Sequence, residues 1–401
     1  MPFPADHDRR HFLATLAGAP ALLTGRAGSL AKSSDDFLFS PGLVYLQTGS
    51  LGPTPRTVID RALGAWRELE QNPVLYGYGA FETAMEEVRE TAAAFLGSRK
   101  DEIVLTSSTT EGMNWVAQGL GLVAGDRVLT TDQEHPGGRV CWDYVARKHG
   151  VLIDTVPLPP DEHDAQAILD AFARRITART RALSFSHVLS STGLRMPVRE
   201  LSDLARRRGC LSVVDGAQAV GGIDVNVKAL RCHVYATSGH KWLLGPTGTG
   251  LLYLSEEIGA AVDPIALQGG RAAYSESSGV RNIPGLVGLG EAMKYVAAVG
   301  KIAVEAHNLA LRDRLYEALR EVPKVRVVSP PPGPLASPLL TYVLPEEVKG
   351  RALYERLLEN HRVVVKVVPS NWLNGHRIST HLFNTERDLE ALVSALKQEL
   401  A

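Results

Sequence analysis

The sequence predicts an α/β protein with a mainly parallel seven-stranded sheet, followed by a small α+β domain. Two observations predict this class. Short apolar runs alternate with amphipathic helical patterns between residues 60 and 255, which is typical of βαβ units. Three of the helical patterns stop at Gly97, Gly150 and Gly209, and glycine is the residue most common just after a helix.

The strands of the large sheet are expected where runs of apolar residues are short: 102–106, 127–131, 151–156, 182–187, 211–215, 234–237 and 250–254. Helices are expected where apolar residues recur with helical spacing: 84–96, 111–118, 138–149, 165–174, 198–208, 287–299 and 303–319. Further along, strands are expected at 339–343, 363–368 and 377–380, with a helix near 352–359 and a last helix opened by Asn384 and Thr385.

These elements group into two domains. Residues 60–290 are expected to form the large domain, and residues 32–59 together with 300–401 the small one. The proline-rich segment 329–334 is a stiff connector.

Composition excludes several classes of function. A net charge of -1 over 401 residues gives no basis for binding nucleic acid. No apolar stretch is long enough for membrane insertion. The three cysteines, Cys141, Cys210 and Cys232, lack metal-ligand spacing, so we expect no metal site and buried, inert thiols.

The N-terminus resembles a targeting signal. Arg9 and Arg10 precede Phe12 and Leu13 and a weakly apolar stretch, a pattern typical of a bacterial twin-arginine signal peptide over residues 1–31. The expected location is therefore the periplasm. The alternative is a partly helical N-terminal arm on a cytoplasmic protein.

A lysine and an aspartate carry the strongest functional signal. Lys241 follows an apolar strand and precedes a glycine-rich loop, where partial desolvation would lower the pKa of its amine enough for attack on an aldehyde. Asp215 ends another buried strand, at the edge of the sheet where ligands bind. A Schiff-base lysine and an aspartate facing a pyridinium nitrogen are the groups that pyridoxal 5′-phosphate (PLP) requires.

The segment 106–112 predicts a phosphate site. It follows a strand, opens a helix and is rich in hydroxyl groups, including those of Thr109 and Thr110. Ser108 and Glu111 also fit a capping box, and both interpretations can hold together.

The segments Asp215-Gly216-Ala217-Gln218 and Ser238-Gly239-His240-Lys241 resemble those of the class V aminotransferase family of fold type I PLP enzymes. The similarity runs from about Tyr45 to the C-terminus. It implies PLP as cofactor, a homodimer and a small amino-acid-type substrate, but members catalyse different reactions.

The resemblance also implies individual roles. Thr109, Thr110, Ser238 and His240 would hold the phosphate. His135 would stack on the pyridine ring.

Two further residues would lie near the phenolic oxygen of the cofactor. Gln218 would hydrogen-bond this oxygen, and Ser190 occupies a region where relatives hold an asparagine near it.

Arg377 is the candidate for the substrate α-carboxylate, because a guanidinium binds a carboxylate through two parallel hydrogen bonds. Ser50 lies in a turn that resembles the substrate-facing turn of the family. His381 is close enough in sequence to line the same pocket, although a core histidine is the simpler interpretation.

Two departures from the family pattern limit the function. Val280 stands where relatives carry a threonine that reaches the phosphate of the neighbouring subunit. The chain has no cysteine after Cys232, whereas desulfurases need one shortly before the carboxylate-binding arginine. Persulfide-forming desulfurase activity is therefore not expected.

The overall pattern is most similar to isopenicillin N epimerase-type members, which indicates epimerisation or racemisation at Cα. Three alternatives stay open: a β-eliminating C–S lyase, a periplasmic enzyme that tailors a siderophore or peptide metabolite, and a PLP-binding protein without turnover. An epimerase needs a second acid or a water on the side opposite Lys241, and the candidate side chains are His381, Tyr76 and Tyr78.

Overall fold

The computed structural model describes residues 35–258, 261–269, 274–369 and 372–401. These residues belong to one compact unit, Ala31–Ala401. The twin-arginine segment lies outside the described residues.

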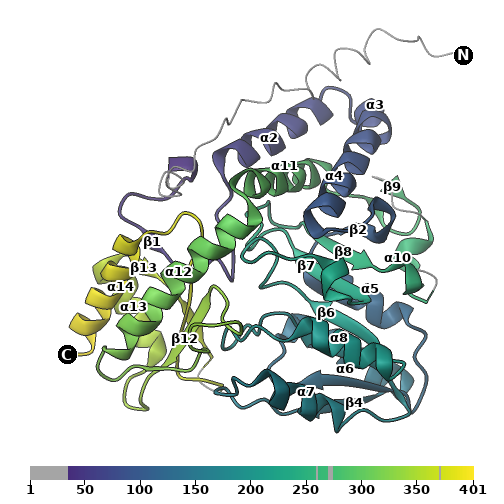
Figure 1. Ribbon diagram of the computed structural model, residues 1–401. Coiled ribbons are helices and arrows are strands. Elements are labelled where there is room, and N and C mark those ends of the chain that lie inside the picture. Colours follow the sequence, from purple (N-terminus) through teal and green to yellow (C-terminus); the bar gives the residue numbers. More distant parts are fainter. Residues whose placement is uncertain (1–34, 259–260, 270–273, 370–371) are drawn as a thin grey trace, which may run out of the picture. The chain divides into compact units, whose positions relative to one another are not determined.

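A seven-stranded sheet with the strand order β2-β8-β7-β6-β5-β3-β4 forms the centre of this unit (Figure 1). All neighbouring strands are parallel except β8, which runs antiparallel to both β2 and β7. The strands lie close to the expected positions: β2 (Ile103–Thr106), β3 (Arg127–Thr131), β4 (Leu152–Val156), β5 (Thr180–Ser186), β6 (Leu211–Asp215), β7 (Val234–Ser238) and β8 (Gly250–Leu254). The predicted fold class is confirmed.

Both faces of this sheet are covered, which explains why its strands are apolar without alternation. Leu183 and Phe185 of β5 pack into one hydrophobic cluster, whereas Ala182 packs into another on the opposite face. The covering helices on the first face include α4 (Phe81–Leu96), α7 (Ala165–Ala173) and α8 (Val198–Arg207), and those on the second include α5 (Thr109–Gly119) and α6 (Pro136–His149).

The C-terminal part contains a four-stranded antiparallel sheet with the order β11-β12-β15-β14. Its strands are β11 (Arg326–Val327), β12 (Leu339–Val343), β14 (Lys366–Val368) and β15 (Gly375–Ser379). Helices α11 (Ile283–Val299) and α12 (Lys301–Arg320) precede it, and α13 (Gly350–His361) and α14 (Glu386–Glu399) pack with it in a hydrophobic cluster of its own.

The N-terminal segment pairs with this part of the chain. Strand β1 (Val44–Tyr45) runs parallel to β13 (Val363–Val364). The run expected as one strand at 363–368 is thus two short strands, which pair with different partners. The assignment of 32–59 to a small domain stays a prediction.

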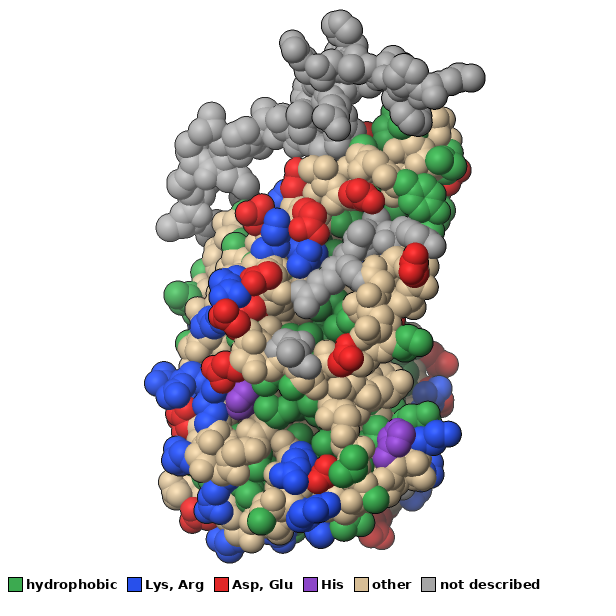
Figure 2. All heavy atoms as spheres, turned by 90° about the vertical axis from the view of Figure 1, so that its right-hand side faces the viewer, with side chains coloured by type: hydrophobic (Ala, Val, Ile, Leu, Met, Phe, Trp, Pro, Cys, Tyr) green, Lys and Arg blue, Asp and Glu red, His purple; other side chains and the backbone are tan. Residues whose placement is uncertain are grey.

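The sequence did not predict the segment between β1 and α4. Helix α2 (Arg56–Leu69) is followed by the short helix α3 (Pro73–Leu75) and the π-helix η2 (Tyr76–Ala80), which leads directly into α4. Several large apolar side chains on these elements are exposed: Leu63, Trp66, Val74, Leu75 and Tyr78. Figure 2 views the molecule from the side of α3 and shows hydrophobic side chains on the upper part of this face.

Among the described residues no helix is long and apolar enough to cross a membrane. Within the same residues no group of histidines, cysteines and acids is arranged to hold a metal ion. All three cysteines are buried, and burial raises the pKa of each thiol.

Candidate active site

One cavity of about 640 Å³ brings together the residues that the sequence predicted to bind the cofactor and the substrate carboxylate. It lies beyond the carboxyl ends of the parallel strands, where α/β proteins bind ligands. The predicted residues that line it are Ser50, Thr109, Thr110, His135, Asp215, Gln218, Ser238, His240, Lys241 and Arg377.

Lys241 follows β7, which ends at Ser238. Burial lowers the pKa of its amine to about 8, the Asp215 carboxylate acts in the opposite direction, and Arg377 lowers it further. A much larger fraction of the amine is therefore uncharged near neutral pH than in an exposed lysine, as nucleophilic attack requires.

Asp215 ends β6 with a buried carboxyl group. Its Oδ1 accepts a hydrogen bond from the Ala217 N–H at 2.9 Å. Its Oδ2 packs against Gly138. A β-carbon at position 138 would lie only 2.6 Å from this oxygen, so a larger residue would clash with it. Burial raises the pKa of the carboxyl group, while Lys241 and His135 favour its charged form. A cation facing this carboxyl would favour the carboxylate further.

Thr109 and Ser238 lie together at one end of the cavity. The Ser238 hydroxyl lies 2.9 Å from the Thr109 N–H and 2.7 Å from the Thr109 hydroxyl, and so joins the end of β7 to the start of α5. Positive partial charge at a helix N-terminus favours an anion. Nδ1 of His240 is buried without a hydrogen-bond partner among the described residues.

The expected capping box is only half formed. The Ser108 hydroxyl accepts from the Glu111 N–H at 3.2 Å, but the Glu111 carboxylate accepts from the Ser107 N–H and not from Ser108. The Ser108 side chain caps α5. The next two residues, Thr109 and Thr110, line the cavity.

His135 caps the N-terminus of α6, and its Nδ1 accepts from the Gly137 N–H at 3.0 Å. The proton of the neutral ring must therefore be on Nε2. Burial lowers the pKa of His135, and Lys241 lowers it further, so the neutral form dominates at pH 7.

Gln218 is held from two sides. Its side-chain oxygen accepts from the indole Nε1–H of Trp242 at 2.9 Å, and its amide nitrogen donates to the Gly49 carbonyl at 2.8 Å. The second N–H of the amide is left for a ligand oxygen.

Arg377 on β15 is buried. Nη1 donates to the Ser190 carbonyl at 2.8 Å, and Nη2 donates to the Ser50 hydroxyl at 3.4 Å. Nε is buried without a partner among the described residues. Burial lowers the pKa of the guanidinium to about 10. A buried guanidinium with an unpaired N–H requires an anion, and a carboxylate fits it.

Sequence reasoning missed three charged residues of the cavity, Asp132, Glu134 and Lys366. Glu134 is partly buried and accepts from the hydroxyls of Ser186 at 2.6 Å and Thr131 at 2.7 Å, and burial raises its pKa to about 7. Its position next to His135, just after a strand, was the available signal. For Lys366 the signal was a single lysine within a run of valines.

The candidates for a second acid do not lie in this cavity. His381 is buried, its Nε2 donates to the Trp242 carbonyl at 2.8 Å, and its Nδ1 accepts from the Leu382 N–H at 2.7 Å. It is thus a core histidine whose two ring nitrogens are both bonded. Tyr76 and Tyr78 belong to η2 and are not among the lining residues.

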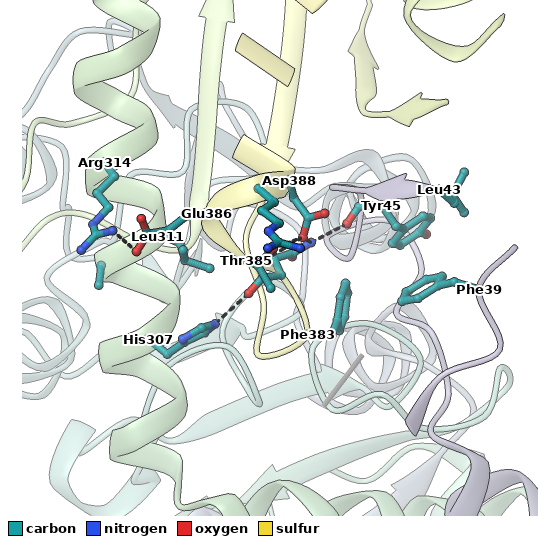
Figure 3. Close-up of a pocket in the computed structure, with 13 residues that line it drawn as sticks. Phe39, Leu43, Tyr45, His307, Leu311, Arg314, Phe383, Thr385, Glu386 and Asp388 are labelled. Atoms are coloured by element: carbon teal, nitrogen blue, oxygen red, sulfur yellow. Dashed lines mark hydrogen bonds and ion pairs between the residues drawn. The ribbon is translucent and has the colours of Figure 1, made fainter. Parts of the chain in front are cut away.

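A second hollow of about 730 Å³ lies beside the start of α14 (Figure 3). Three of its charged groups already have partners: Arg314 pairs with Glu386, and Asp388 accepts from the Thr385 N–H that it caps. His307 Nε2 is bonded to the Asn384 carbonyl. This hollow lacks the lysine and the buried arginine of the first cavity.

The first cavity fits PLP. The Thr109–Ser238 end and the unpaired Nδ1 of His240 suit a phosphate, Asp215 suits a protonated ring nitrogen, and Lys241 suits the aldehyde. The buried Nε of Arg377 remains for a substrate. Fold and cavity together define a PLP-dependent enzyme of fold type I.

Comparisons with known proteins agree with this class. Residues 44–392 match the family Aminotransferase class-V. The chain is 33% identical to an isopenicillin N epimerase of Amycolatopsis lactamdurans over 93% of its length and 99% of the relative. It is 32% identical to a cysteine desulfurase of Salmonella newport over 72% of its length and 75% of the relative.

Solved structures give the same fold. A cysteine desulfurase of Thermococcus onnurineus superposes with a TM-score of 0.81 at 24% identity, covering 94% of this chain and 99% of that chain. The cystine C–S lyase C-DES in complex with cysteine persulfide superposes with a TM-score of 0.80 at 22% identity. The match covers 89% of this chain and 98% of that chain.

The chain belongs to the aminotransferase class V family. It is a PLP-dependent enzyme, and its cofactor is pyridoxal 5′-phosphate.

Proposed function

We propose that the protein catalyses epimerisation or racemisation at Cα of an amino acid or an amino-acid conjugate. The observation that carries the proposal is the shared cavity of Lys241 and Arg377, whose unpaired Nε is suited to an α-carboxylate. Similarity to isopenicillin N epimerases over nearly the full length of both chains supports the reaction type.

Arg377 and Lys241 have separate roles in this reaction. Arg377 binds the α-carboxylate and so fixes which bond at Cα is cleaved. When bound, the cofactor accepts the electron pair left at Cα after loss of the proton. The amine of Lys241, with its pKa lowered to about 8, takes the Cα proton on one face and can return it there.

Epimerisation also needs a proton donor on the other face of Cα. With His381 bonded on both nitrogens and Tyr76 and Tyr78 outside the lining residues, a water molecule on that face becomes the candidate.

The second candidate function is β-elimination by a C–S lyase. It needs the same Cα–H cleavage but no second acid, and the fold is shared with the lyase C-DES. Tailoring of an exported siderophore or peptide metabolite, and PLP binding without turnover, stay open as weaker alternatives. Desulfurase chemistry is disfavoured because the loop before Arg377 has no cysteine.

Incubation of candidate substrates in D₂O separates these functions. Epimerisation gives deuterated substrate of both configurations and no keto acid. Elimination gives a keto acid, ammonia and a released thiol. Stoichiometric keto acid with the cofactor left in its amine form would overturn both proposals and indicate transamination.

We also propose that the protein is a homodimer. The exposed apolar side chains of Trp66, Val74 and Leu75, together with Ile265 and Val280, support association with a second copy. Light scattering at micromolar concentration tests this, and a monomer would refute it. The proposed location is the periplasm, reached through the twin-arginine segment.

A further inference from the structure

Beside Arg377 the cavity contains a second cation, Lys366, which the proposed chemistry at Cα does not use. We infer that Lys366 binds a second carboxylate, on the side chain of the substrate, and that the enzyme acts on α-amino acids whose side chain ends in an acid. The inference rests on the proposed function, because it assigns the substrate class of the same site.

The two cations are direct cross-strand neighbours. Lys366 of β14 pairs in register with Arg377 of β15 in an antiparallel sheet, so both side chains project from the same face. Both line the cavity. Like charges in directly opposed positions destabilise a sheet, so the pair is unfavourable until an anion lies between or beside the two groups.

Nothing else in the described part of the cavity neutralises Lys366. No hydrogen bond or ion pair to its ammonium is formed among the described residues. The three carboxylates that line the cavity have other partners: Asp132 accepts from the Leu158 N–H, Glu134 from Ser186 and Thr131, and Asp215 from the Ala217 N–H. Burial and the nearby Arg377 both lower the pKa of Lys366, which agrees with a cation that lacks a counter-charge.

The surroundings distinguish a side-chain subsite from a second contact to the α-carboxylate. Arg377 is deeply buried, whereas Lys366 is exposed at the outer part of the cavity. Val368, Pro369 and Trp372 line the cavity on the same segment. These apolar groups can cover the methylene groups of a substrate side chain, and Lys366 can then bind its terminal carboxylate.

The test compares substrates that differ only in the terminal charge. L-glutamate and L-glutamine, and their D enantiomers, are titrated into the holoenzyme, and dissociation constants are read from the change in cofactor absorbance. The wild type should bind glutamate roughly tenfold or more tightly than glutamine, as expected for a hydrogen bond to a charged group. Aspartate and α-aminoadipate then define the preferred length.

Three variants assign the preference to Lys366. Lys366→Met keeps the aliphatic stem and should bind glutamate and glutamine equally, with glutamine affinity unchanged. Lys366→Arg should retain the preference for glutamate. Lys397→Met removes an exposed lysine on α14 and should behave like the wild type.

The outcomes separate this inference from the proposed function. Equal binding of glutamate and glutamine by the wild type, or a preference that persists in Lys366→Met, would overturn the second carboxylate while leaving chemistry at Cα intact. If no α-amino acid changes the cofactor absorbance, this inference fails, and the proposed function then holds only for an amino-acid conjugate.

Discussion

The indole Nε1–H of Trp242 donates to the side-chain oxygen of Gln218 at 2.9 Å, and so connects the residue after Lys241 to the segment after Asp215. Both side chains are buried. The bond fixes the orientation of the Gln218 amide, whose nitrogen must then point toward the Gly49 carbonyl and the cavity.

Replacing Trp242 by phenylalanine leaves the buried Gln218 oxygen without its donor. We expect the free energy of unfolding to fall by roughly 1–3 kcal/mol, in addition to the loss of packing. Urea denaturation of Trp242→Phe, Gln218→Leu and the double variant measures the coupling. Simple additivity of the two single effects would show that this hydrogen bond contributes nothing.

Attachment of PLP to the apoprotein should depend on pH through Lys241. Only the neutral amine attacks the aldehyde, so the rate should rise with pH through a midpoint at about 8, the lowered pKa of this residue. Stopped-flow absorbance between pH 6 and about 10 measures this. Because Asp215 raises the pKa of Lys241, Asp215→Asn should shift the midpoint to lower pH. A wild-type midpoint near that of a free lysine would contradict the account.

Glu134 should make the stability of the apoprotein pH-dependent. Its folded-state pKa of about 7 exceeds the ordinary value of 4.5, so the folded state retains a proton that the unfolded state has lost. The resulting stability is fully present below pH 4.5 and is lost as pH rises to about 7. Relative to Glu134→Gln, the wild type should lose roughly 1.4 kcal/mol per pH unit within this window. If the difference in free energy of unfolding between the wild type and Glu134→Gln is the same at pH 5 and at pH 7, the raised pKa of Glu134 is refuted.

Most of the fold was predictable because its signals are local. The strands of the large sheet are short apolar runs, and helix ends such as Gly97 and Gly150 are glycines with positive φ. The segment from α2 to η2 was missed because its apolar residues stay exposed and do not mark a core-facing stripe. Residues 363–368 form two strands because one part pairs with β1 and the other with β15. A local sequence pattern cannot predict such long-range pairings.

The candidate site was predictable where a residue follows a strand of the large sheet, as with Asp215 and Lys241. Roles that depend on distant contacts were not. Sequence proximity could not show that His381 is bonded to the Trp242 carbonyl, nor that Lys366 lies opposite Arg377.

Export is predicted from Arg9 and Arg10. Replacing both by lysine should retain the protein in the cytoplasm of a host with a twin-arginine system, because the paired arginines are the feature such a signal requires. Fractionation of cells that express the two forms measures this. Identical distribution of wild type and variant would indicate that the segment is only an N-terminal arm.

Reduction of the purified protein with borohydride, followed by peptide mass spectrometry, tests the central claim most directly. The protein should be yellow, lose its long-wavelength absorbance on reduction, and carry the reduced pyridoxyl group on the peptide that contains Lys241. Lys241→Ala should carry no such group. A colourless protein that takes up no added PLP, or a label on another lysine such as Lys366, would contradict the account.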